Sequence, residues 1–156
     1  TRRTAPPAGP SAARVWTLDG AVQFEREYPD DALAVRWLQS APPGVIAEAV
    51  GEKYASYQDF AHISTYSGLP TVMGWGGHEA QWRGSYEGHA QRELDIRRLY
   101  ETSSWDEARA ILEKYDIRYV YVGTLERSTY RVNEIKFQQF LQPVYQGGGV
   151  VIYAVP

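Results

Sequence analysis

The sequence contains no cysteine, and only three of its 156 residues are histidine. Without cysteine the chain can form neither disulfides nor thiolate metal sites, and catalysis by a thiol is excluded. Disulfides are permitted but not required outside the cytosol, so the absence of cysteine leaves the cellular compartment open.

Membrane spans and a strong basic charge are also lacking. No apolar run approaches the roughly 18 residues that a spanning helix needs, and the first residues do not form a signal peptide. The formal charge of -3 argues against a nucleic-acid partner, because such domains usually cluster Lys and Arg. The sequence as given predicts a soluble chain that binds no nucleic acid.

The common signatures of enzymes and cofactors are absent as well. The sequence has no phosphate-binding loop, no G-x-S-x-G nucleophile elbow and no dinucleotide fingerprint. His78 and Glu79 do not begin a His-Glu-x-x-His zinc motif, because position 82 is Trp. We therefore expect neither a bound metal nor a cofactor.

The residues that are present predict one α/β domain. Hydrophobic residues make up 44% of the chain, enough for a sizeable core in a single domain of this length. The Pro- and Ala-rich residues 1–14 are predicted to form a flexible arm, and residues 15–156 the domain. Because the chain begins at Thr1 rather than Met, we expect it to be a fragment of a longer protein, with room upstream for a membrane segment.

Hydrophobic periodicity, capping signals and the positions of Gly and Pro predict the elements of this domain. Expected helices cover residues 29–40, 90–100, 105–115 and 134–140. Expected strands cover residues 45–50, 71–73 and 117–123, with an extended piece up to residue 24, a polar connection after residue 123 and a hairpin over residues 143–155. The pattern predicts a small mixed sheet of about four to five strands with helices packed on it and a C-terminal β-hairpin.

Residues 68–84, called here the Gly/Trp segment, have the most unusual composition. Closely spaced glycines alternate with five candidate ligand-binding residues: Trp75, His78, Glu79, Trp82 and Arg83. Glycine lets the backbone approach a ligand, and tryptophan offers a broad apolar face with one donor. The charged side chains suit anions or hydroxyl-rich ligands. The structural alternative is that His78 braces the loop.

Acids and tyrosines follow two of the predicted strands. Glu48 lies near the end of the first strand, on the same face as Ile46 and Val50, and Tyr54 follows in the adjoining loop. Because burying an unpaired carboxylate is costly, Glu48 needs either a ligand or an ion pair with an arginine such as Arg83 or Arg97.

Glu126, Arg127 and Tyr130 occupy the same topological position after strand 117–123. Open α/β sheets place their clefts at the carboxyl ends of the strands. If the Gly/Trp segment folds over this edge, acids and tryptophans would line one cleft, which is typical of a saccharide site.

Two other interpretations remain open. The first is a carbohydrate-active hydrolase that uses Glu48 or Glu79 together with Glu126, which requires two carboxyl groups about 5–10 Å apart across a cleft. The second is a protein-interaction module with an aromatic surface.

The chain resembles the YYY family of large multi-pass membrane proteins. The resemblance spans most of the sequence and is carried by residues 17–20 (TLDG), 34–38 (AVRWL), 48–49 (EA), 65–71 (TYSGLPT), 74–75 (GW), 77–84 (GHEAQWRG), 115, 118–123 (RYVYVG) and 125–127 (LER). Several of these motifs are long and unusual in composition.

The resemblance implies a soluble, extracytoplasmic C-terminal domain of a membrane protein. The membrane portion of the family is similar to glycosyltransferases that use lipid-linked sugar donors. The expected partners are thus the membrane portion of the same chain and a glycan or lipid-linked sugar. The family assigns no catalytic residue, and we expect the isolated domain to be an accessory or acceptor-binding unit without catalysis of its own.

Overall fold

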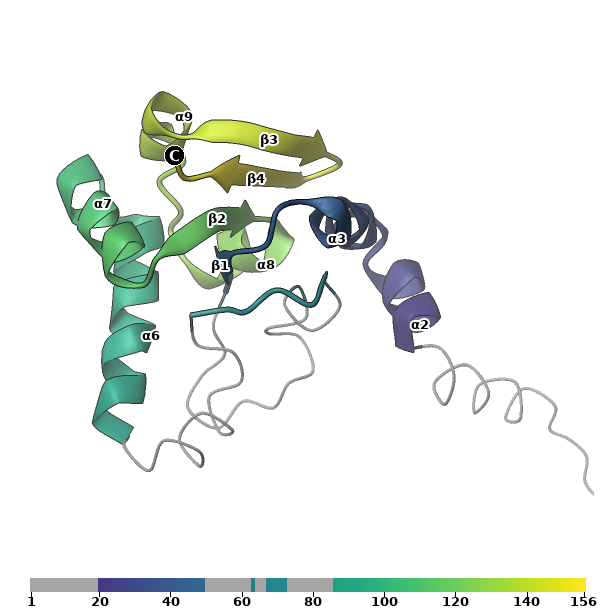
Figure 1. The fold of residues 1–156 in the computed structure, drawn as a ribbon, viewed down its shortest axis with the longest axis horizontal. Helices are drawn as coiled ribbons and strands as arrows, with labels where there is room; N and C mark the ends of the chain where they lie inside the picture. The colour runs from purple at the N-terminus through teal and green to yellow at the C-terminus, as the bar shows by residue number, and fades with distance from the viewer. Residues whose placement is uncertain (1–19, 50–62, 64–66, 73–85) are drawn as a thin grey trace, which may run out of the picture.

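The computed structural model describes residues 20–49, 63, 67–72 and 86–156 (Figure 1). A four-stranded sheet forms its centre, in the order β1-β2-β4-β3. The strands are β1 (Val45–Ala47), β2 (Ile117–Val122), β3 (Gln142–Gly147) and β4 (Val150–Ala154). β1 and β2 are parallel, whereas β4 is antiparallel to both of its neighbours. This confirms the predicted mixed sheet with a C-terminal hairpin.

Helices cover the sheet in two groups (Figure 1). They are α2 (Gly20–Glu27), α3 (Pro29–Ser40), α6 (Tyr86–Glu101), α7 (Trp105–Lys114), α8 (Thr124–Thr129) and α9 (Ile135–Phe140). Along β2, Tyr119 and Tyr121 join a core cluster with α2 and α3. Val120 and Val122 join a second cluster with α6, α7 and α9. The alternation of side chains along a strand thus supplies both layers of the core.

Local sequence signals explain where the best-predicted helices begin and end. α3 starts at Pro29, carries Asp30 and Asp31 in its first turn, and ends at Ser40, before two prolines. In α7 the Ser104 side chain accepts a hydrogen bond from the N–H of Glu107, 3.3 Å away. Both helices therefore lie where capping and dipole effects favour them.

The structure corrects the sequence-based assignment of two segments. Residues 20–24 were expected to be extended, but they belong to α2. The ring of Phe24 packs on that of Tyr28, just after the helix, with 5.6 Å between their centroids. The polar connection after β2 contains α8, which begins at Thr124 and whose first turn is capped by the Glu126 side chain accepting the N–H of Gly123.

Two predicted strands are shorter than expected. β1 ends at Ala47 rather than at residue 50. In place of a strand over 71–73, Thr71 makes a single parallel bridge with Ile46, while residue 73 lies outside the described residues. Within the described ranges, no helix combines the length and the apolar character needed to cross a membrane.

The hairpin turn packs against the start of α3. Gly148 has φ +58°, in the left-handed region that favours glycine. A Cβ atom at this position would lie against the Asp30 carboxylate, 2.6 Å from its Oδ2 atom. The turn therefore needs glycine both for its backbone angle and for its close approach to α3.

We predict that Gly148→Ala lowers the free energy of unfolding by about 2–4 kcal/mol, because backbone strain and overpacking add at this site. Urea denaturation of both proteins measures the difference. The matched control is Gly149→Ala, since its nearest neighbour to a new Cβ is Arg127 Nη1 at 3.9 Å. Equal stability losses in the two variants would contradict the proposed contact with Asp30.

Candidate functional site

The carboxyl ends of the parallel strands β1 and β2 bring two sequence-predicted acids together, and we call this region the carboxyl edge. Glu48 follows β1 directly, and Glu126 lies in α8, just after β2. Both are buried, with 3% and 2% of their surface exposed. They lie in the interior of the described structure.

Glu126 joins the ends of the two strands through its carboxylate. Its Oε1 atom accepts the N–H of Gly123 at 2.9 Å, and its Oε2 atom accepts the N–H of Ala49 at 2.8 Å. The first bond caps α8, and the second reaches across to the residue that follows Glu48. Glu126 therefore satisfies two buried N–H donors that belong to different elements.

Burial raises the pKa of Glu126 to about 7, and the N–H donors of Ala49 and Gly123 offset only part of this effect. Asp31 adds to the increase through its charge. A Cβ atom on Gly123 would lie 3.2 Å from Asp31 Oδ1, which shows how closely this third carboxylate approaches. The hydroxyl of Tyr121 donates to the same Oδ1 atom.

Glu48 and Tyr100 hold the other chain segments at this edge. The Glu48 carboxylate accepts the N–H of Ile63 at 3.3 Å. The hydroxyl of Tyr100 lies 2.9 Å from the carbonyl of Ala47 and 2.7 Å from that of Tyr121, so its proton is shared between the two strand ends. Burial and the nearby Glu126 raise the pKa of Tyr100 well above 10.0, which keeps this donor protonated.

Hydrogen bonds hold residues 70–72, near the start of the Gly/Trp segment, against β1 and α6. The N–H of Ile46 donates to the carbonyl of Pro70 at 2.9 Å, and the Thr71 hydroxyl donates back to the carbonyl of Ile46 at 3.0 Å. Arg92 of α6 donates to the carbonyl of Val72 at 3.1 Å. Residues 70–72 are thus tied to β1 on one side and to α6 on the other.

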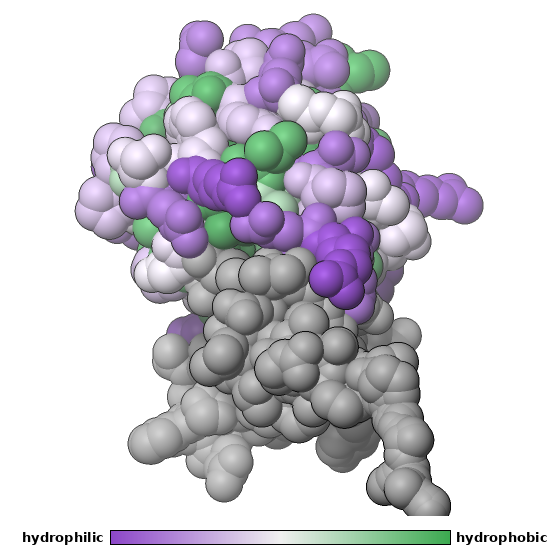
Figure 2. Space-filling view, turned by 90° about the vertical axis from the view of Figure 1, so that its right-hand side faces the viewer, coloured by the Kyte–Doolittle hydropathy of each residue, from purple (hydrophilic) through white to green (hydrophobic). Residues whose placement is uncertain are grey.

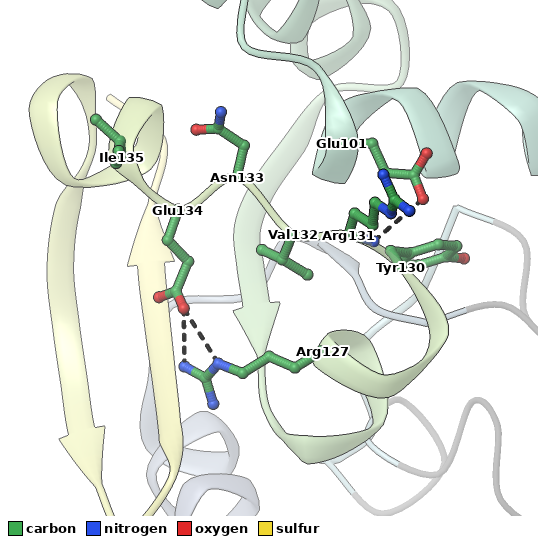
Figure 3. Close-up of a pocket in the computed structure, with 8 residues that line it drawn as sticks. All are labelled: Glu101, Arg127, Tyr130, Arg131, Val132, Asn133, Glu134 and Ile135. Atoms are coloured by element: carbon green, nitrogen blue, oxygen red, sulfur yellow. Dashed lines mark hydrogen bonds and ion pairs between the residues drawn. The ribbon is translucent and has the colours of Figure 1, made fainter.

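Arg127 and Tyr130 do not join the two buried acids. Arg127 pairs with Glu134 at 3.1 Å (Figure 3). It also donates to the carbonyl of Gly149. Tyr130 is buried and stacks on Tyr100, with 5.2 Å between the ring centroids. Both residues line a separate surface groove.

The remaining predicted site residues lie outside the described residues: Tyr54, Trp75, His78, Glu79, Trp82 and Arg83. Their convergence with Glu48 and Glu126 stays a prediction. In the described part of the chain, no group of three or more acidic or histidine side chains is placed to hold a metal ion.

Sequence reasoning missed Tyr100 and Asp31 as members of the carboxyl edge. Tyr100 lies at the end of the helix predicted over residues 90–100, and Asp31 near the start of the one predicted over residues 29–40. Neither position signals a contact with β2. Both residues bond to Tyr121, which follows Tyr100 by 21 positions and Asp31 by 90 positions in the sequence. A tyrosine on the buried face of a helix does need a partner for its hydroxyl, and this was the available clue.

We predict that Glu126 makes the protein less stable as the pH rises. Its pKa is raised from 4.5 to about 7 by folding, so the folded state holds its proton more tightly and is favoured at low pH. Between pH 4.5 and pH 7 this contribution falls by about 3 kcal/mol. Urea denaturation at pH 5 to pH 8 should show the decline in the native protein relative to Glu126→Gln, which cannot titrate.

The matched control is Glu113→Gln, which makes the same change of side chain at an exposed position away from the carboxyl edge. If the free energy of unfolding changes with pH in the same way in the native protein and in Glu126→Gln, Glu126 does not titrate in this range.

No protein-family model matches the chain, and no curated protein matches it. Among solved structures, the fold is similar to the C-terminal globular domain of an oligosaccharyltransferase from Archaeoglobus fulgidus. The similarity covers 81% of this chain and 97% of that domain, with a TM-score of 0.50 and a sequence identity of 13%. The likeness is one of fold, and it extends over nearly the whole of the archaeal domain.

Proposed function

We propose that the chain is an extracytoplasmic accessory domain of a membrane protein related to glycosyltransferases that use lipid-linked sugars. Its role is to bind a glycan or a lipid-linked sugar and to pack against the membrane portion of its own chain. The observation that carries this proposal is the fold shared with the C-terminal globular domain of an oligosaccharyltransferase. The sequence resemblance to the YYY family agrees with it.

The bonding of the two buried acids favours an accessory role over hydrolysis. A glycosidase needs two carboxyl groups that face a sugar across an open cleft. Glu126 instead uses both of its oxygens to accept backbone N–H groups, and Glu48 accepts one from Ile63. These carboxylates stabilise the chain around the carboxyl edge.

The described surface gives less support to a protein-interaction module. Its strongly exposed large hydrophobic residues are distributed over three helices: Leu33 on α3, Leu94 on α6, and Ile135 and Phe140 on α9. On the face that Figure 2 shows, hydrophobic residues form small groups among hydrophilic ones. A stable protein interface usually has a contiguous apolar centre.

Within this proposal the Gly/Trp segment contacts the ligand through Trp75, His78, Glu79, Trp82 and Arg83, and Tyr54 contributes from the preceding loop. The described residues support it, because the positions just before both stretches are held by hydrogen bonds. Ala49, bonded to Glu126, precedes Tyr54 in the sequence, and residues 70–72, bonded to β1 and α6, precede the tryptophans.

We predict that titrating the ¹⁵N-labelled chain with neutral oligosaccharides, or with a polyprenyl-phosphate-linked sugar in micelles, shifts the indole N–H signals of Trp75 and Trp82. Stacking of a sugar on an indole ring changes its magnetic environment directly. Trp37, packed against Tyr119, and Trp105, stacked on Phe140, serve as internal controls. Unchanged Trp75 and Trp82 signals with every ligand would argue against sugar binding by this segment.

We also predict that the purified chain neither transfers a sugar from a lipid-linked donor nor hydrolyses a glycan, because the donor site belongs to the membrane portion. Chromatographic detection of the released or transferred sugar checks this. Turnover by the pure chain that is lost in Glu79→Gln would overturn the accessory role and favour a self-contained enzyme.

A further inference from the structure

A groove on the surface lies apart from the carboxyl edge. It has a volume of about 610 Å³, within the range of about 300–1,000 Å³ typical of small-molecule sites. Its walls come from the last residue of α6, the end of α8 and the segment that leads into α9 (Figure 3). The lining residues are Glu101, Arg127, Tyr130, Arg131, Val132, Asn133, Glu134 and Ile135.

The backbone of the groove is held in place by buried hydrogen bonds. The N–H of Asn133 donates to the carbonyl of Tyr100 at 2.8 Å. The ammonium group of Lys136 donates to the same carbonyl at 3.0 Å and to the carbonyl of Asn133 at 2.7 Å. Lys136 is buried, and burial lowers its pKa to about 8. These bonds fix the floor of the groove to the C-terminal end of α6.

Two carboxylates of the groove are held by hydrogen bonds and ion pairs with neighbouring residues. Glu134 accepts from Arg127 at 3.1 Å and from the hydroxyl of Tyr153 at 3.1 Å. Glu101 accepts the N–H of Arg131 at 3.2 Å and pairs with Arg97 at 3.7 Å. Both acceptors are therefore pre-positioned, as in binding sites whose side chains are supported by a second layer of bonds.

Two donors of the groove have no such partners. In the part of the chain that the structure describes, neither the Arg131 guanidinium nor the Asn133 amide makes a hydrogen bond. Figure 3 shows the Arg131 side chain on the side of Glu101, with Asn133 between it and Ile135 along the segment. The groove thus offers fixed acceptors next to free donors.

The charges of the lining favour a neutral ligand. Two arginines and two glutamates cancel, and Val132 and Ile135 add apolar surface. A phosphate would meet both carboxylates, whereas a sugar hydroxyl can donate to them and accept from Arg131 or Asn133. Neutral, hydroxyl-rich molecules are therefore the chemical class that this lining matches best.

We propose that this groove is a binding subsite for a neutral saccharide residue, with Glu101 and Glu134 as acceptors and Arg131 and Asn133 as donors. The choice of a saccharide rests on the proposed function, whereas the groove itself rests on the geometry given above. It is a second contact point for a glycan, in addition to the Gly/Trp segment.

The test is a titration of the ¹⁵N-labelled chain with neutral disaccharides, with inorganic phosphate in a separate arm. We expect backbone shifts in Glu101 and residues 130–135, and a binding constant at least tenfold weaker in Arg131→Ala/Asn133→Ala. These side chains make no hydrogen bonds within the described residues, so the double variant should fold as the native protein does. Arg98→Ala, on the exposed face of α6 outside this groove, is the control and should bind normally.

The outcomes separate this inference from the proposed function. Shifts confined to the Trp75 and Trp82 indoles would overturn the groove as a subsite and leave sugar binding by the domain in place. Shifts in residues 130–135 with phosphate alone would overturn the choice of a neutral ligand. Shifts in the groove without any in Trp75 and Trp82 would support the subsite and contradict the proposed role of the Gly/Trp segment.

Discussion

The carboxylate of Glu126 is the interaction on which the rest of the described structure depends. It accepts one N–H from the start of α8 and one from Ala49, after β1, so a single side chain joins the ends of two parallel strands. Tyr100 adds a second link by sharing its hydroxyl proton between the carbonyls of Ala47 and Tyr121. Polar bonds, rather than close apolar packing alone, thus determine the geometry at this edge. The desolvation of Glu126 is the free-energy cost of that arrangement.

The arrangement also explains why acids at the ends of strands are ambiguous signals of function. Such positions attract catalytic residues in open α/β folds, because loops diverge there and leave a cleft. They equally attract side chains that satisfy the last backbone donors of the strands. In this protein Glu126 does the second, and Glu48 accepts the N–H of Ile63. Arg127, one position after Glu126, faces the surface groove. Adjacent residues on a short helix therefore belong to two different regions.

Much of the fold was predictable because its signals are local. The prolines around α3, the capping serine of α7 and the β-branched run of β2 each fix an element without reference to distant residues. The extended assignment of residues 20–24 was wrong because so short a segment shows no decisive hydrophobic period in the sequence. The site was less predictable: Asp31 and Tyr100 enter it through contacts that no spacing in the sequence encodes.

The order of strands in the sheet has a consequence for folding. β4 follows every other described strand in the chain, yet it lies between β2 and β3 and pairs with both. During synthesis, β2 therefore has no partner on the side that β4 later occupies until β4 has left the ribosome. Closing the sheet requires contacts between residues far apart in sequence, which slows folding relative to a chain of local contacts. Until β4 pairs with it, the edge of β2 has unpaired backbone groups that can pair with other strands.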